Sequence, residues 1–342
     1  MRTIEIIKPG LFTTVQDLGR WGFQRFGMSV AGAMDHFALR VANLLVDANE
    51  DEAVLEITMM GPEIKFNCDE VIAVTGADMQ PLLNGKPVTM WTSVHVKMDD
   101  ILSFKGLKAG LRSYIGFSRG IDVPIIMNSK STFTRGKIGG FEGRKLEAGD
   151  TIELGNRVLP DSGSYLPQKY SMEYKTENTI RVVLGPQDDY FTDEAIKVFS
   201  TSEYTITSEA DRMGYRLEGP KIEHNESADI ISDGIVFGSV QVPGHGSPIL
   251  MMADRQTTGG YTKIATVITP DLSVLGQMVP GNKLKFEIID IDEAQKIYID
   301  SENKLKEIAE FIKDNRYEFR AVQDMKFRMG ENEFTVNVRE II

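Results

Sequence analysis

The first 160 residues are rich in short stretches where apolar and polar positions alternate. In residues 92–98, TSVHVKM, one face carries Val94, Val96 and Met98, and the other face carries polar side chains. This period of two predicts a half-buried strand. Further strands are predicted for EVIAVTGAD, for VTMWTSV and for the end of LEAGDTIEL, with LNGKP as a turn between two of them.

Other segments have the spacing of amphipathic helices. Residues 33–46, AMDHFALRVANLLV, place apolar side chains on one face, and Asp35 is a plausible N-cap. A second helix, DYFTDEAIKVFST, follows the predicted strand IRVVLGP, and residues 292–315 form a charged amphipathic helix. The pattern therefore predicts a mainly β protein with some helices, of the α+β class.

Residues 155–179 are polar and interrupted by prolines, which is typical of a linker. We place a domain boundary there, giving a β-rich N-terminal domain at 1–165 and a second domain at 166–342. The second domain ends in an extension, 292–342, made of the charged helix and a hairpin-like tail. A solvated helix is the simplest interpretation of that extension, and an interaction surface is the alternative.

The charge balance narrows the class of partner. The formal net charge is −12, and a surface of that sign repels phosphate backbones, so nucleic acid is not expected as a partner. A local basic pocket for a small anion is compatible with that charge. The 42% hydrophobic content is that of an ordinary globular protein.

Cysteine content and hydropathy bear on location. The single cysteine, Cys68, cannot form an internal disulfide. No run approaches the roughly 18 apolar residues of a membrane span, and the opening MRTIEIIKPG has no apolar signal region. We therefore expect a cytoplasmic protein with no membrane partner.

Familiar catalytic motifs are missing from the sequence. There is no complete phosphate-binding P-loop, no G-x-S-x-G and no H-E-x-x-H, and the four histidines are too dispersed to predict a metal site. Phosphate can still bind through backbone N–H groups and one basic side chain.

Three stretches combine glycines with acidic, basic and amide side chains. Residues 13–35 contain Gln16, Asp17 and Arg20 before a helix start, and residues 208–220 contain Asp211 and Arg212 beside a turn. The third stretch, 232–268, contains Gln241 and the segment DRQTTGGYTKIATVI.

That third segment offers the densest set of hydrogen-bonding groups. It begins after a predicted buried strand, PILMMAD, and continues into a helix or an apolar strand. Glycines ahead of a helix start would present N–H groups to an anion, and a lysine would add charge. The alternative is a tight turn between core elements. The candidate residues are Asp254, Thr257, Thr258, Gly259, Gly260, Tyr261 and Lys263.

These stretches carry a resemblance to a known family. KPGLFTTVQDLGRWG, GMSVAGAMDHFALRVANLLV, GKIGGFEGRKLEAGD, ITSEADRMGYRLEGP and ADRQTTGGYTKIATVI resemble the KipA family, also called allophanate hydrolase subunit 2 or PxpC, the 5-oxoprolinase C subunit. The match runs from about residue 4 to residue 290. One departure is that His245, in VPGHGSP, stands where an acid is expected, which puts a fixed role for that position in doubt.

The resemblance implies a fold and an activity. It implies a C-terminal cyclophilin-like β-barrel and a smaller β-rich N-terminal domain. Members act with a PxpB (KipI-like) subunit and a PxpA-like subunit, and the complex opens 5-oxoproline to glutamate using ATP and Mg²⁺. The expected enzyme is thus a hydrolase subunit, inactive without its partners.

Each group of candidate residues would have its own role in that reaction. Arg212, Arg20 and Lys263 would stabilise charge on the transferring phosphoryl group. Asp211 or Asp254 would hold Mg²⁺ or take a proton. Tyr261 and Gln241 would orient the lactam. The other candidate binding groups are Gln16, Asp17, the two threonines and the two glycines of 257–260.

Two other functions remain open at this point. The same unit occurs in the carboxyltransferase domain of biotin-dependent urea carboxylase. The chain has no M-K-M biotinyl site, so biotin is not expected here without a separate carrier. The third possibility is a KipA-like regulator that binds and antagonises KipI.

Overall fold

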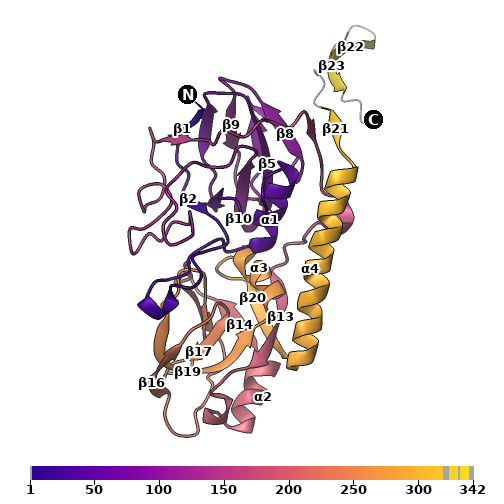
Figure 1. Ribbon diagram of the computed structural model, residues 1–342. Helices are drawn as coiled ribbons and strands as arrows, with labels where there is room; N and C mark the ends of the chain where they lie inside the picture. The colour runs from indigo at the N-terminus through magenta and orange to yellow at the C-terminus, as the bar shows by residue number, and fades with distance from the viewer. Residues whose placement is uncertain (1, 319–322, 330–331, 339–342) are drawn as a thin grey trace.

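The structure is a computed structural model that describes residues 2–318, 323–329 and 332–338. Two β-rich halves lie end to end, and one long helix runs along the side of both (Figure 1). The tail predicted as a hairpin is an antiparallel pair, β22 (Gln323–Met329) with β23 (Asn332–Val338). The rest of that tail, at 319–322, 330–331 and 339–342, lies outside the described residues.

The first half contains two sheets that share one apolar core. One sheet has the strand order β11-β1-β4-β9-β6-β7, and the other has the order β2-β3-β10-β5-β8. The strands are β1 (Thr3–Lys8), β2 (Phe12–Gln16), β3 (Val54–Thr58), β4 (Glu63–Phe66), β5 (Glu70–Asp78), β6 (Pro81–Leu83), β7 (Lys86–Pro87), β8 (Ser93–Val96), β9 (Ile101–Phe104), β10 (Ala109–Phe117) and β11 (Thr151–Glu153).

The second half is a closed β-barrel. The strands run in the order β13-β20-β14-β15-β18-β17-β19, and β13 also pairs with β19, so seven strands close the ring. Strand β16 is added outside the ring on β19. The bounds are β13 (Glu177–Leu184), β14 (Glu203–Ile206), β15 (Gly214–Glu218), β16 (Asp229–Gly234), β17 (Ser239–Val242), β18 (Ile249–Met251), β19 (Thr258–Val267) and β20 (Lys283–Ile288).

The helices connect and cover these β-structures. The Asp35 carboxylate caps the first long helix by accepting from the Ala38 N–H at 2.9 Å, as predicted. The helical elements are η1 (Gln24–Phe26), α1 (His36–Leu45), η2 (Gln168–Tyr170), η3 (Asp188–Tyr190), α2 (Asp193–Thr201), α3 (Thr269–Gln277) and α4 (Ile291–Asp314). No helix of the described chain is both long and apolar enough to cross a membrane.

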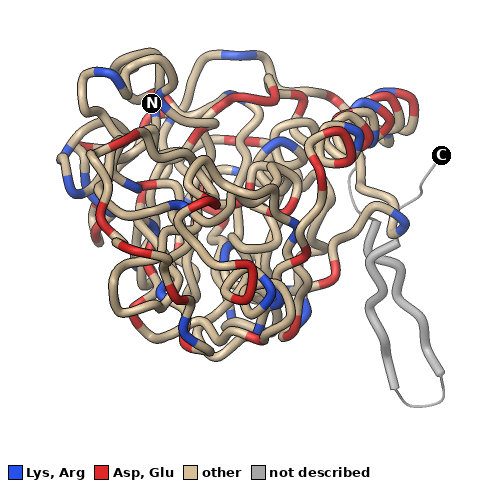
Figure 2. The backbone as a smooth tube through the Cα atoms, turned by 90° about the horizontal axis from the view of Figure 1, so that it is seen from below, with Lys and Arg blue, Asp and Glu red and all other residues tan. Residues whose placement is uncertain are grey.

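Helix α4 packs back onto the first half. Its apolar stripe of Leu305, Ile308 and Ile312 is buried against α1, and Arg40 of α1 binds Glu302 with an N–O distance of 2.7 Å. Acidic and basic residues are interspersed along α4 (Figure 2). A short pair, β12 (Ser162–Gly163) with β21 (Tyr317–Glu318), adds a second link. The proposed boundary at residue 165 stays a prediction.

The mainly β fold is confirmed, and local strand predictions need three corrections. Strand β8 ends at Val96, so Met98 lies in a turn and is exposed instead of facing the core. In VTMWTSV, Trp91 has a φ of 57°, outside the strand region, so β8 begins only at Ser93. The segment after Gly259 is strand β19, so the helix alternative is wrong.

Candidate functional site

The candidate residues fall at three neighbouring places rather than in one pocket. Gln16, Asp17 and Arg20 lie at the end of β2 and in the loop that follows. Arg212 and Asp254 lie in the seam between the halves, and the remaining residues lie on or near β19. The loop at 18–32 joins these places, because it leaves the first half and reaches down beside the barrel (Figure 1). Ser29 of that loop donates to the Arg255 carbonyl at 3.0 Å.

Asp17 organises the loop cluster. Its carboxylate accepts from the Gly19 N–H at 2.8 Å, the Ser129 hydroxyl at 2.8 Å and the Lys130 N–H at 2.6 Å, and also from the Ser131 hydroxyl. With these acceptor positions taken, Asp17 joins two loops and is not available to a ligand. Its role in this structure is positional.

Gln16 and Arg20 are also enclosed. The Gln16 amide donates to Thr14 and to the Thr132 carbonyl at 3.0 and 3.1 Å. Arg20 donates to the Ile126 and Ser131 carbonyls at 3.0 and 2.7 Å. Burial lowers the pKa of Arg20, and its Nη1 has no hydrogen-bond partner among the residues that the structure describes.

Arg212 and Asp254 form a buried ion pair in the seam. Arg212 Nε and Nη2 donate to the two Asp254 oxygens at 3.1 and 3.0 Å, and Nη1 donates to Glu56 of β3. Burial alone would lower the pKa of Arg212, but the two carboxylates raise it above its ordinary value. Burial raises the pKa of Asp254, and Arg212 opposes that shift.

A wider hydrogen-bond network extends this ion pair between the halves. Tyr114 of β10 donates to Glu56 at 2.9 Å, and Arg112 donates to the Tyr215 hydroxyl of β15 at 2.8 Å. Gln277, at the end of α3, donates to Asp35 at 2.8 Å and accepts from the Arg112 N–H at 3.0 Å. The network links the barrel to the first half, and Arg212 and Asp254 lie within it, so their catalytic role stays a prediction.

Asp211 is the exposed exception in this region. Its side chain is 54% exposed and lies 3.2 Å from Arg135 of the first half. Its Oδ1 accepts the backbone N–H groups of Met213 and Gly214, which forms the turn before β15. Asp211 thus faces solvent at the seam, with a cation beside it.

Lys263 is a candidate cation on the barrel face. Its side chain is buried, and Nζ lies 2.9 Å from Asp233 of β16, whose carboxylate is half exposed. Gln187 holds both groups, since it accepts from the Lys263 N–H at 3.2 Å and donates to Asp233 at 3.3 Å. Lys263 lowers the pKa of Asp233. The ammonium group is therefore fixed just below an open surface.

Gly259 of β19 makes room for Gln241. A Cβ at Gly259 would lie 2.9 Å from Gln241 Nε2, and 2.6 Å from a methyl of Ile235. Gln241 is buried and donates to the Tyr261 carbonyl at 3.4 Å. Thr258 and Tyr261 point to solvent, while Thr257 and Gly260 are half exposed. Because β19 is a strand, no helix dipole assists anion binding here.

The described residues include no arrangement that could hold a metal ion, and the candidate residues lie outside two cavities of the molecule. No group of three or more His, Cys, Asp or Glu side chains within them is arranged to hold a metal ion. A cavity of about 630 Å³ and a hollow of about 430 Å³ occur elsewhere, and no candidate residue lines either one. The candidate groups that can meet a ligand are on open surface.

Comparison with known proteins gives the family. Residues 26–288 match the model described as carboxyltransferase domain, subdomain A and B. The chain belongs to this carboxyltransferase family. It is 37% identical over 310 residues to the 5-oxoprolinase C subunit of Haemophilus influenzae, covering 90% of this chain and 98% of that protein. It is 37% identical over 306 residues to the corresponding 5-oxoprolinase protein of Escherichia coli, covering 90% and 97%.

A larger carboxyltransferase relative has a similar fold. The crystal structure of the K. lactis urea amidolyase matches with a TM-score of 0.85 at 29% identity, over 90% of this chain and 20% of that chain. The urea amidolyase of Saccharomyces cerevisiae is 31% identical over 315 residues, and the match covers 17% of its length. This chain thus corresponds to one part of those larger proteins.

The sequence analysis missed several groups in the seam between the halves and beside Lys263. Glu56, Arg112 and Gln277 are buried hydrogen-bonding partners, and Asp233 and Gln187 hold Lys263. Glu56 had one visible signal, because it is an acid within the apolar strand VLEIT. The others had none, since their partners are distant in sequence.

Proposed function

We propose that this chain is the C subunit of an ATP-dependent 5-oxoprolinase, working with a PxpB (KipI-like) subunit and a PxpA-like subunit. The support is a match over nearly the whole length of two proteins named as 5-oxoprolinase C subunits. A subunit name implies a complex, and the reaction would convert 5-oxo-L-proline to L-glutamate with hydrolysis of ATP. We also expect a cytoplasmic location.

One observation carries the proposal that this chain holds half of a site. The fixed Lys263 ammonium and the exposed Tyr261 and Thr258 lie on β19, and none of them lines either of the two cavities described above. Two neighbouring apolar side chains, Ile231 and Val236, are 94% and 55% exposed. A partner covering this face would bury those side chains and exclude water from the polar groups.

In this reaction the chain would stabilise negative charge and orient the substrate. ATP would phosphorylate the lactam carbonyl oxygen, water would add to that carbon, and the ring C–N bond would break to leave an acyl phosphate. A second water would hydrolyse the acyl phosphate to glutamate and phosphate. Lys263 would offset developing negative charge, since its position is fixed before substrate arrives. Tyr261 and Thr258 would hydrogen-bond the substrate from the open face. Arg212 and Asp254 would hold the seam behind them.

Mg²⁺ does not fit this chain by itself. Both Asp254 oxygens accept from Arg212, and the Asp211 oxygens are engaged by backbone N–H groups and Arg135. Mg²⁺ is usually held by one or two carboxylates together with phosphate oxygens. We assign the metal to the complex and derive no step through it.

The first experiment measures 5-oxoproline-dependent ADP release. The chain is assayed alone, with its PxpB-like companion, and with both companions. Activity in the full mixture only supports the proposal and a shared site. A stable complex with no activity in any mixture would contradict it and favour carboxyl transfer or regulation.

Matched variants test the half-site separately. Ile231→Asp should abolish association with the PxpB-like subunit, whereas Val158→Asp, at a position 92% exposed in the linker, should not. Tyr261→Phe should lower kcat/KM by about ten-fold if one hydrogen bond to substrate is lost. Tyr190→Phe, at an exposed tyrosine, is the control. If the two variants of either pair have equal effects, the proposal that this face of β19 binds substrate and the partner is contradicted.

A second candidate function is a biotin-dependent carboxyltransferase component. The urea amidolyase matches favour it, because one of them has a TM-score of 0.85 with this chain. It is the weaker candidate, because the identity is lower and the match covers only a small share of those proteins. Biotin-dependent carboxyl transfer, measured with an added biotin carrier protein, distinguishes the two.

A further inference from the structure

Large apolar side chains are exposed on two loops beside the seam between the halves. Trp21 and Phe26, in the loop at 18–32, are 52% and 69% exposed, and Ile125, in a neighbouring turn, is 69% exposed. We call these three residues the loop patch. Clusters of exposed apolar side chains with a polar rim commonly mark protein–protein interfaces.

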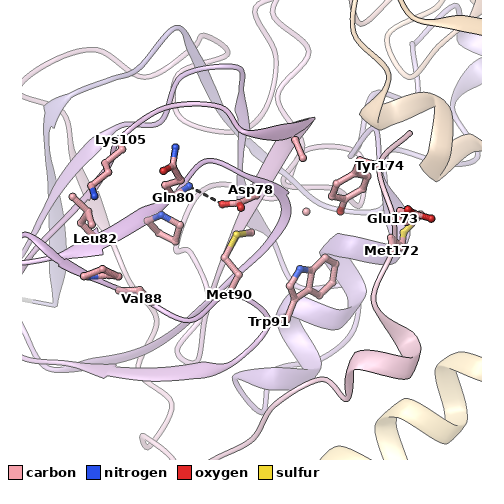
Figure 3. A pocket seen from close by; sticks show the side chains of 14 residues that line it. Asp78, Gln80, Leu82, Val88, Met90, Trp91, Lys105, Met172, Glu173 and Tyr174 are labelled. Carbon is pink, nitrogen blue, oxygen red and sulfur yellow. Dashed lines mark hydrogen bonds between the residues drawn. The ribbon is translucent and has the colours of Figure 1, made fainter. Parts of the chain in front are cut away.

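The two tryptophans of the chain have different surroundings. Trp91 lies in the first half, where it lines a cavity together with Met90 and Tyr174 (Figure 3). Trp21 is half exposed, and its indole N–H donates to the Leu18 carbonyl at 2.9 Å. Because this polar group already has a partner, another protein can cover the exposed ring without loss of a hydrogen bond. Trp21 therefore has the properties of an interface anchor.

Buried hydrogen bonds hold the loop patch in place. Arg20 is fully buried and donates to the Ile126 carbonyl at 3.0 Å and to the Ser131 carbonyl at 2.7 Å. These bonds tie the two loops of the patch together. Gly139 makes room for the guanidinium, since a Cβ there would lie 2.5 Å from Arg20 Nη2. Loops that are already fixed lose little conformational entropy when a partner binds, which favours association.

The loop patch adjoins the exposed face of β19 across the seam. Ser29, three residues after Phe26, donates to the Arg255 carbonyl at 3.0 Å, and Arg255 Nε donates to the Ile235 carbonyl at 3.3 Å. The next residue, Val236, is exposed and borders the face of β19 that is proposed to meet a partner. Figure 1 shows the loop that contains η1 beside the barrel. A standard interface covers about 800 Å² and roughly 20–30 residues on each partner, so one partner can cover both surfaces.

The composition of the loop patch favours a protein as its partner. The Arg25 guanidinium lies 4.7 Å from the centre of the Phe26 ring, so a cation stands at the rim. Tryptophan and arginine are enriched at the energetic centres of protein interfaces, and acidic groups on a partner would complement Arg25. The crystal structure of TTHA0988 matches with a TM-score of 0.77 at 30% identity, over 84% of this chain and 55% of that chain. That protein thus carries further chain beside the shared fold.

We propose that the PxpB-like subunit straddles the seam and covers the loop patch together with the face of β19. This inference rests on the proposed function, which supplies the partner. Trp21 and Phe26 would enter apolar pockets of that subunit, and Arg25 would meet acidic groups at the rim. A partner bound to both halves would also hold the barrel and the first half in one arrangement.

Isothermal titration calorimetry of the full chain with the PxpB-like subunit tests the inference. Phe26→Asp should weaken binding by about thirty-fold or more, and Trp21→Ala by about ten-fold, because buried aromatic anchors carry much of the binding energy of an interface. Met98→Asp is the matched control, at a position 61% exposed in the turn after β8, and should change the Kd by less than about two-fold. All three positions are exposed, so the thermal midpoints of the variants should equal that of the wild-type chain.

The outcomes separate this inference from the proposed function. Equal Kd values for Phe26→Asp and Met98→Asp, in a complex whose wild-type form releases ADP, would overturn the inference and leave the proposed function standing. If the wild-type chain does not associate with the PxpB-like subunit, both are overturned. Light scattering of the free chain tests a second copy as the occupant. A dimer that Phe26→Asp converts to a monomer would overturn the inference, because another copy of this chain would then cover the loop patch.

Discussion

Replacement of Arg212 by methionine tests whether the seam is a structural joint or a catalytic centre. Arg212 is buried, donates twice to Asp254 and once to Glu56, and also donates to the Gly32 carbonyl. Methionine keeps an unbranched apolar stem in place of the arginine stem and removes the charge and the hydrogen-bond donors. Asp254 would then remain buried without an ion-pair partner, and Glu56 would keep only Arg112, whose Nε lies 4.0 Å from its carboxylate.

The expected cost follows from those contacts. Removing one partner of a buried ion pair destabilises a protein by about 3–5 kcal/mol, because the remaining charge stays desolvated. Here Asp254 loses its ion-pair partner and Glu56 loses the closer of its two cations, so we expect a loss near the upper end, about 5 kcal/mol. Some of this loss would be relieved as the carboxyls take up protons, because the pKa of Asp254 is already raised by burial.

Urea unfolding of the chain without partners measures this free energy. Arg216→Met is the control, because Arg216 lies four residues further along the chain in β15, is 54% exposed and pairs with Glu209 at 2.7 Å on the surface. A surface pair of that kind contributes at most about 1 kcal/mol. If Arg212→Met unfolds like the control but eliminates ADP release in the complex, Arg212 is catalytic and the structural assignment is refuted.

Three further predictions concern stability. Burial raises the pKa of the Glu70 carboxyl from 4.5 to about 7. As pH falls, this carboxyl is protonated in the folded protein before it is protonated in the unfolded chain, so the free energy of unfolding should rise between pH 8 and pH 5. Glu70→Gln should remove this slope, worth up to about 3 kcal/mol, in unfolding measured across that pH range; an unchanged slope would contradict the raised pKa. Ile308→Ala, in the buried stripe of α4, should lower the free energy of unfolding by about 2–5 kcal/mol. Ile299→Ala, at a half-exposed position of the same helix, should lower it by less than about 0.5 kcal/mol. Urea unfolding measures both values, and equal losses would show that α4 does not pack against the first half. Gly76→Ala should lower the thermal midpoint by several degrees, because its φ is +76° and a Cβ would lie 2.3 Å from the Arg112 carbonyl oxygen; no change would contradict this backbone geometry.

The candidate site shows what residue types alone can predict about function. The stretches rich in glycine and charge did identify the residues that join the halves, because buried charges and glycines at close approaches are unusual in any chain. Arg212 and Asp254 were expected to act on a substrate, yet the structure encloses them with Glu56. The sequence does not show whether an arginine links two domains or binds a substrate, and only its neighbours in the structure distinguish the two roles.

The sequence by itself determined the local elements and the family. Alternation predicted the strands, the apolar stripe of 292–315 predicted the long helix, and the motifs predicted the carboxyltransferase family, because these depend on near neighbours and on residue identity. Tertiary structure decided which carboxylate meets Arg212, whether β19 is a strand, and where α4 packs. Those outcomes depend on pairings between residues far apart in the chain, such as Val267 with Val182, whose energies no single segment contains.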